Sequence, residues 1–151
     1  MLFATVLHPT IGDLLRSVRT TRPDPVMVAM VGIAAGPLLA FASANLELQR
    51  RGVGEHAMLG HYGFMAAFAL TVIGVGLLSS ERADGGGRLP AWVAGALAAA
   101  IGTASIVFPE VEPRLDLPWA LGAIGWGIAF VVAAERRNRV AQRRTVESIL
   151  S

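Results

Sequence analysis

The chain has 151 residues, of which 54% are hydrophobic and only 16% are charged, and it contains no cysteine. A soluble domain carries about 25% charged residues. No Asp, Glu or Arg occurs in four long stretches of this chain, which are 26–44, 57–78, 91–108 and 117–134. This distribution excludes a soluble globular enzyme, a nucleic-acid-binding domain and a disulfide scaffold. It predicts an integral membrane protein, with the lipid bilayer as its solvent.

The basic residues are all arginine, and 13 of them against 11 acidic residues give a net charge of +2. Arginine without lysine, together with abundant alanine and glycine, is typical of a GC-rich bacterial coding bias. We therefore do not interpret the basic balance as a signal for binding nucleic acid. The absence of cysteine excludes thiolate metal sites and Fe–S ligation.

Residues 1–25 are predicted to form an N-terminal segment with a short amphipathic helix over residues 10–20. Its apolar side chains recur at helical spacing on one stripe, and they are Ile11, Leu14, Leu15 and Val18. Such a helix lies in the headgroup layer with its apolar face down. The alternative is that it packs on the protein itself.

Residues 26–134 are predicted to form the membrane domain, an all-α bundle of four transmembrane helices at the charge-free stretches. A helix rises about 1.5 Å per residue, so about 20 residues cross a hydrocarbon core of about 30 Å. Residues 135–151 then form an arginine-rich tail.

Arginine counts set the expected orientation. Ten of the 13 arginines fall in the N-terminal segment, the loop between the second and third helices, and the tail. The other two loops carry only Arg50, Arg51 and Arg114. Because cytoplasmic loops are enriched in basic residues, both termini are expected inside, in the inner membrane of a bacterium. Trp92 and Trp119 then lie at opposite membrane boundaries, and Trp126 packs between helices.

Small residues at four-residue spacing let transmembrane helices approach closely. Gly32 and Gly36 form a GxxxG in the first helix, and Gly63 and Gly95 begin similar stripes in the second and third. These glycines serve either packing within the chain or docking to another subunit or to a second copy. Gly32 and Gly36 are the best candidates for an external contact.

Two histidines lie near the second helix. His56 and His61 are five residues apart, which places them about 140° apart on a regular helix, so they could not bind one metal from such a helix. His61 remains a candidate cofactor ligand, although a haem would need a second ligand from another helix at the same depth. His56, Glu110 and Glu112 are candidates for a cation site. The simpler interpretation is interfacial histidines and solvated loop charges.

The sequence contains no nucleophile elbow, HExxH, phosphate loop or CxxC motif, and no ionisable group within the spans apart from His61 and Tyr62. We therefore expect no enzyme and no resident cofactor. The leading hypothesis is a non-catalytic accessory, assembly or anchoring subunit of a larger membrane complex. The alternatives are a small oligomeric transporter or channel, and a haem- or metal-binding subunit that uses His61.

The tail carries five arginines within nine residues, and they are Arg136, Arg137, Arg139, Arg143 and Arg144. One interpretation is that they only fix the orientation of the fourth helix. The other is that they contact anionic lipid or an acidic partner, because the inner leaflet is negative.

The orientation can be tested with reporter fusions. Fusions at Gly86 and Ser151 should report a cytoplasmic location, and fusions at Gly52 and Val111 an external one. Paired reporters that are active on opposite sides of the membrane measure this directly. An external signal from Ser151 in otherwise intact protein would contradict four spans with both termini inside.

Overall fold

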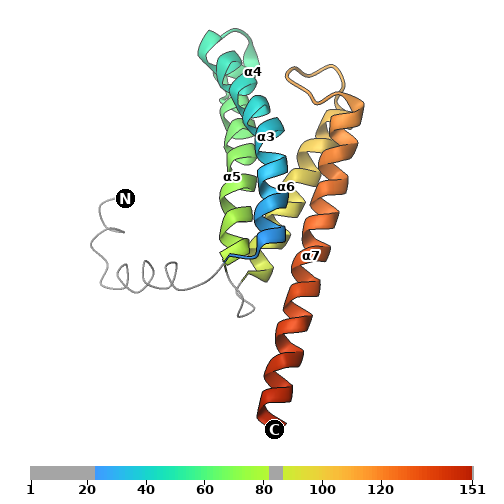
Figure 1. Ribbon diagram of the computed structural model, residues 1–151. Coiled ribbons are helices and arrows are strands. Elements are labelled where there is room, and N and C mark those ends of the chain that lie inside the picture. The colour runs from blue at the N-terminus through green and yellow to red at the C-terminus, as the bar shows by residue number, and fades with distance from the viewer. Residues whose placement is uncertain (1–22, 82–86, 151) are drawn as a thin grey trace, which may run out of the picture.

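The computed structural model describes residues 23–81 and 87–150, and all regular structure within these ranges is helical. The helices, in chain order and with the labels of Figure 1, are α3 (Pro25–Arg51), α4 (Glu55–Met58), α5 (His61–Glu81), α6 (Arg88–Val107) and α7 (Leu117–Leu150). The amphipathic helix predicted over residues 10–20 lies outside the described residues.

Four of these helices, α3, α5, α6 and α7, are long and apolar enough to cross a membrane. They pack side by side as a bundle, and α7 extends well beyond the others at one end (Figure 1). The prediction of an all-helical protein with four apolar spans is therefore confirmed. Only 22 to 33% of the residues in each span are buried, and the others are exposed or partly exposed.

Helix α3, the first of the described helices, begins and ends at residues that cap it. Asp24 accepts hydrogen bonds from the backbone nitrogens of Val26 at 2.9 Å and Met27 at 3.0 Å, and Pro25 occupies the first turn. Gly52 ends the helix in the left-handed conformation, with φ of 63°. The helix thus continues past the predicted end at residue 44.

The predicted second helix is interrupted. The stretch 57–78 was expected as one helix, but α4 ends at Met58 and α5 begins at His61. Gly60 between them has φ of 74°, a conformation open to glycine and disfavoured for side chains with a Cβ. The backbone therefore changes direction at Gly60, and residues on either side do not follow one helical repeat.

The interior consists of two buried clusters stacked along the bundle. One contains Leu38, Phe41, Ala42, Ala66, Ala69, Val72, Ala98 and Ile101. The other contains Met27, Val31, Ala91, Ala94, Phe130 and Ala134. Trp126 packs against both clusters, stacks on Phe130 at 4.7 Å between ring centroids, and donates from Nε1 to the Met30 carbonyl at 2.9 Å. Trp126 therefore packs between helices, as predicted.

The α6 and α7 backbones approach each other through glycines. A Cβ added at Gly95 would lie 2.6 Å from Val131 Cγ2 and 2.7 Å from the Gly127 carbonyl oxygen. A Cβ at Gly127 would meet the Gly95 carbonyl oxygen, and one at Gly102 would meet the Ala120 carbonyl oxygen, each at clashing distance. Only glycine fits at these three positions, because a carbonyl oxygen in a helix cannot move aside.

Gly127→Ala should lower the free energy of unfolding by about 1–3 kcal/mol, because the added methyl group enters a backbone contact. Gly125→Ala is the matched control on the same helix, since a Cβ there meets no described atom within 4 Å. It should be neutral or stabilising by up to about 1 kcal/mol, because alanine favours the helix. Thermal unfolding in detergent measures both. Equal effects of the two substitutions would contradict the close α6–α7 contact.

Candidate functional site

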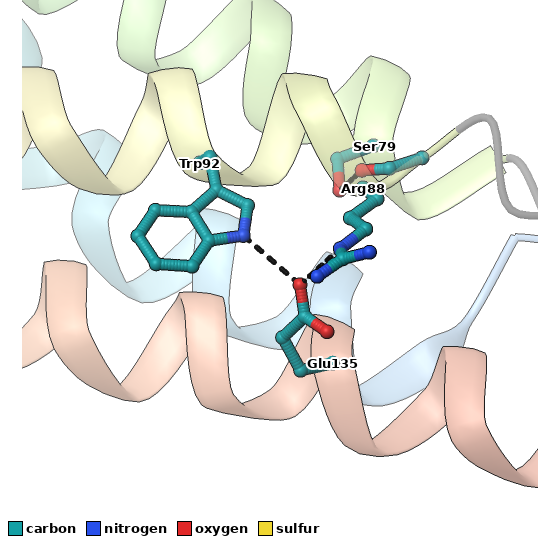
Figure 2. A network of polar contacts seen from close by, with 5 residues as sticks. Ser79, Arg88, Trp92 and Glu135 are labelled. Atoms are coloured by element: carbon teal, nitrogen blue, oxygen red, sulfur yellow. Dashed lines mark hydrogen bonds and ion pairs between the residues drawn. The ribbon is translucent and has the colours of Figure 1, made fainter.

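A polar network joins the start of α6 to α7 near the end from which α7 extends. Figure 2 shows the Glu135 carboxylate accepting from both Arg88 and Trp92. The distances to Glu135 Oε1 are 2.6 Å from Arg88 Nε and 2.9 Å from Trp92 Nε1. Trp92, predicted as a boundary anchor, thus has a specific acceptor on the neighbouring helix.

The end of α5 is tied to the same region. Its last carbonyls would otherwise lack partners, and Arg137 donates to the carbonyls of Ser79 at 2.9 Å and Ser80 at 3.3 Å. The Asp24 nitrogen also donates to the Ser80 carbonyl, at 2.9 Å, and Ser79 Oγ donates to the Gly87 carbonyl at 3.0 Å. We interpret these contacts as structural ties, because the Ser79, Ser80 and Gly87 carbonyls are engaged by the chain itself. The buried side chain of Asn138, the residue after Arg137, has no hydrogen-bond partner among the described residues.

The tail arginines therefore differ in their surroundings. α7 continues without a break through residues 135–150, and Arg137 caps the α5 end. Arg136, Arg139 and Arg143 are exposed, whereas the side chain of Arg144 lies outside the described part of the chain. A role for Arg137 inside the fold was not predicted from the sequence, because it depends on where α5 ends.

A cavity of about 500 Å³ lies at the opposite end of the bundle, beside α4. We call it the α4-end cavity. Its polar lining residues come from α3, α4, α5, α6 and the loop before α7, and they are Asn45, His56, His61, Tyr62, Ser105, Glu112 and Arg114. It is the best candidate for a binding site, because it combines volume with several convergent polar groups.

His56 and His61 meet at this cavity. Their Nδ1 atoms are 3.2 Å apart and their ring centroids 5.3 Å apart, with the rings tilted by 37°. The expectation that they point in different directions was wrong, because it assumed a continuous helix. The change of direction at Gly60 brings the two rings together.

Asn45 forms part of the cavity wall and is fully buried. Its Nδ2 donates to the Phe41 carbonyl at 3.0 Å, which fixes the amide orientation because two oxygens cannot pair there. Its Oδ1 has no hydrogen-bond partner among the described residues. The cavity wall thus contains a buried acceptor that is not satisfied.

Gln49 holds the helix break in place. Its Nε2 donates to the Ala57 carbonyl at 2.7 Å, and its Oε1 accepts from the Gly63 nitrogen at 3.1 Å. One α3 side chain therefore fixes both α4 and the first turn of α5, and with them the two histidines. Gly63, predicted as a helix-packing residue, has this amide as its neighbour rather than another backbone.

The acidic candidates do not complete a metal cluster. Within residues 23–81 and 87–150, no three His, Asp or Glu side chains gather closely enough to hold a metal ion. Glu110 and Glu112 are both exposed on the loop, where Arg114 donates to the Pro109 carbonyl at 2.6 Å. His56 thus has His61 as its close neighbour, not the two glutamates.

The other predicted packing glycines separate into two groups. Gly95 lies at a close contact with α7, whereas a Cβ at Gly32 or Gly36 would meet no described atom within 4 Å. Gly102 and Gly127, which contribute equally to the α6–α7 contact, were not predicted as packing residues. Glycine content alone does not show which glycine faces a neighbour.

A second cavity, of about 230 Å³, lies between α3 and α7, which touch at few points. Its lining is almost entirely apolar and includes Pro37, Phe41 and Trp119. It offers space but little polar chemistry that would select a ligand.

Comparison of the chain with protein-family models, curated proteins and solved structures finds no significant match.

Gln49→Ala should destabilise the α4 end, because it removes two hydrogen bonds to backbone groups. The expected loss is about 1–3 kcal/mol in the free energy of unfolding, with faster amide hydrogen exchange across residues 55–65. Gln142→Ala, at an exposed position of α7, is the control and should change neither quantity. Wild-type exchange across residues 55–65 in Gln49→Ala would show that another contact holds the break.

Proposed function

We propose that this protein is a non-catalytic, multi-pass subunit of a larger membrane complex, with an accessory, assembly or anchoring role. In this proposal it resides in the inner membrane of a bacterium with both termini in the cytoplasm, as the arginine distribution favours. The observation that carries the proposal is an open stripe of small residues along α3.

The stripe consists of residues that share one face of α3 and are all exposed, and they are Ala29, Gly32, Gly36, Ala40 and Ser43. At about 100° per residue they fall within about 80° of one another around the helix axis. We call this surface the α3 stripe. A Cβ on either glycine meets no described atom within 4 Å, so none of the described helices occupies the surface there.

Large apolar side chains are exposed beside the stripe on α3 itself, at Ile33 and Leu39, and on the outward faces of the neighbouring helices. α5 exposes Phe64 and Phe68, and α6 exposes Trp92 and Ile106, each by 40% or more. Such side chains contact lipid tails favourably, whereas small residues in a row allow another helix to approach closely. The α3 stripe therefore fits a transmembrane helix of a partner subunit better than it fits lipid.

The exposed tail arginines support an additional contact. Arg136, Arg139 and Arg143 are exposed on α7, whose C-terminal part extends beyond the bundle (Figure 1), and we propose that together with Arg144 they contact anionic headgroups. Each basic residue near a negative leaflet contributes about 1 kcal/mol. Arg137 is excluded from this role because it caps α5.

Gly36→Leu tests the proposal. The new side chain should block the partner helix without disturbing the fold, because it points into open space. Tagged wild-type protein purified in mild detergent should retain a stoichiometric partner, and Gly36→Leu should lose at least tenfold of it at unchanged thermal stability.

Gly74→Leu is the matched control, because Gly74 is equally open but lies on α5. It should retain the partner. Undiminished recovery with Gly36→Leu, or a wild-type protein that purifies as a monomer, would contradict the proposal. Recovery of further copies of this chain alone would favour the oligomeric transporter or channel instead.

A further inference from the structure

We propose that His56 and His61 bind a divalent transition-metal cation of the Zn²⁺ class at the α4-end cavity, through their Nδ1 atoms. The proposal does not depend on the subunit role. The site lies at the end of the bundle opposite the arginine tail, and it does not include the α3 stripe.

The separation of the two nitrogens is the first argument. Two nitrogens bound to one tetrahedral Zn²⁺ at 2.0–2.1 Å lie about 3.3–3.4 Å apart. The Nδ1 atoms of His56 and His61 are 3.2 Å apart, so both can ligate one ion after a shift of a few tenths of an ångström. A direct hydrogen bond is the competing explanation, and it requires a proton on one of the two Nδ1 atoms.

Accessibility is the second argument. Both histidines are exposed, so an ion from solution can reach them. Imidazole suits Zn²⁺, Cu²⁺ and Ni²⁺, whereas Mg²⁺ and Ca²⁺ prefer oxygen ligands. The chain has no cysteine that would compete for the ion, and it has only one further histidine, His8.

The cavity beside the pair is the third argument. No third His, Asp or Glu joins the pair among the described residues, so water or a small ligand would fill the remaining coordination positions. His56 and His61 both line this cavity, which leaves room for such ligands.

The structural element that forms the site is the helix break. On an uninterrupted helix the two side chains would diverge by about 140°. Gly60 with φ of 74° turns the chain between them, and Gln49 anchors both sides of the turn to α3. The pair is therefore held by contacts that do not themselves involve the histidines.

The test uses the full-length protein purified in detergent and stripped of metal. Zn²⁺ is titrated calorimetrically, and Co²⁺ serves as an optical probe because its visible absorption reports coordination geometry. Wild-type protein should bind one ion per chain. His56→Gln and His61→Gln should each weaken binding at least tenfold, and His8→Gln, the matched control, should bind as wild type does.

Thermal unfolding distinguishes loss of the site from loss of the fold. Zn²⁺ should raise the unfolding temperature of wild type and His8→Gln, because a ligand that binds the folded state stabilises it. It should not raise that of His56→Gln or His61→Gln, whose metal-free unfolding temperatures should stay near wild type. No saturable binding to wild type, binding that survives both His56→Gln and His61→Gln, or binding lost in His8→Gln would overturn the proposal.

Discussion

The backbone contact between α6 and α7 fixes the position of the longest helix and of every group that α7 carries. Three pairs follow one antiparallel register, and they are Gly102 with Ala120, Gly95 with Gly127, and Arg88 with Glu135. Successive pairs are separated by seven residues on α6 and by seven or eight on α7, which is two helical turns. The ion pair at the start of α6 is thus in register with the glycine contacts, and Trp126 and Phe130 reach the core from the same helix.

In a bilayer, the backbone N–H and C=O groups that still need hydrogen-bond partners are those at the ends of the helices. Lipid offers no hydrogen bonds, and at the end near Glu135 the chain supplies its own: Arg137 for the last carbonyls of α5, and Asp24 for the first nitrogens of α3. At the α4 end, Ser105 Oγ accepts from the Leu115 nitrogen at 3.1 Å and orders the loop before α7. The Arg137 contacts join segments that are far apart in sequence, whereas Asp24 and Ser105 satisfy backbone groups nearby in the chain.

The sequence predicts the four long apolar helices and their approximate positions, because charge-free stretches long enough to span a bilayer are visible directly in the sequence. It does not predict the break at Gly60, since the stretch 57–78 contains no Asp, Glu or Arg and no proline. It does not identify Gly102 and Gly127, because in lipid the outward face of a helix is as apolar as the inward face, and periodicity no longer shows which side is buried. For the same reason Gly36 and Gly95 look alike in sequence, yet one is open and the other is in backbone contact. His56 and His61 were identified as candidates, but their meeting depends on the break and could not be predicted without it.

Asn45 shows why the α4 end differs from an ordinary packed helix end. Its Nδ2 bonds to the Phe41 carbonyl, which within a helix already accepts the backbone nitrogen four residues later. The amide therefore adds one shared hydrogen bond and leaves a buried oxygen unsatisfied, and an unsatisfied buried acceptor costs about 1–3 kcal/mol. An apolar side chain of similar size would avoid that cost, so Asn45 does not improve the bundle itself. Only a hydrogen-bond donor that reaches Oδ1 would offset the cost.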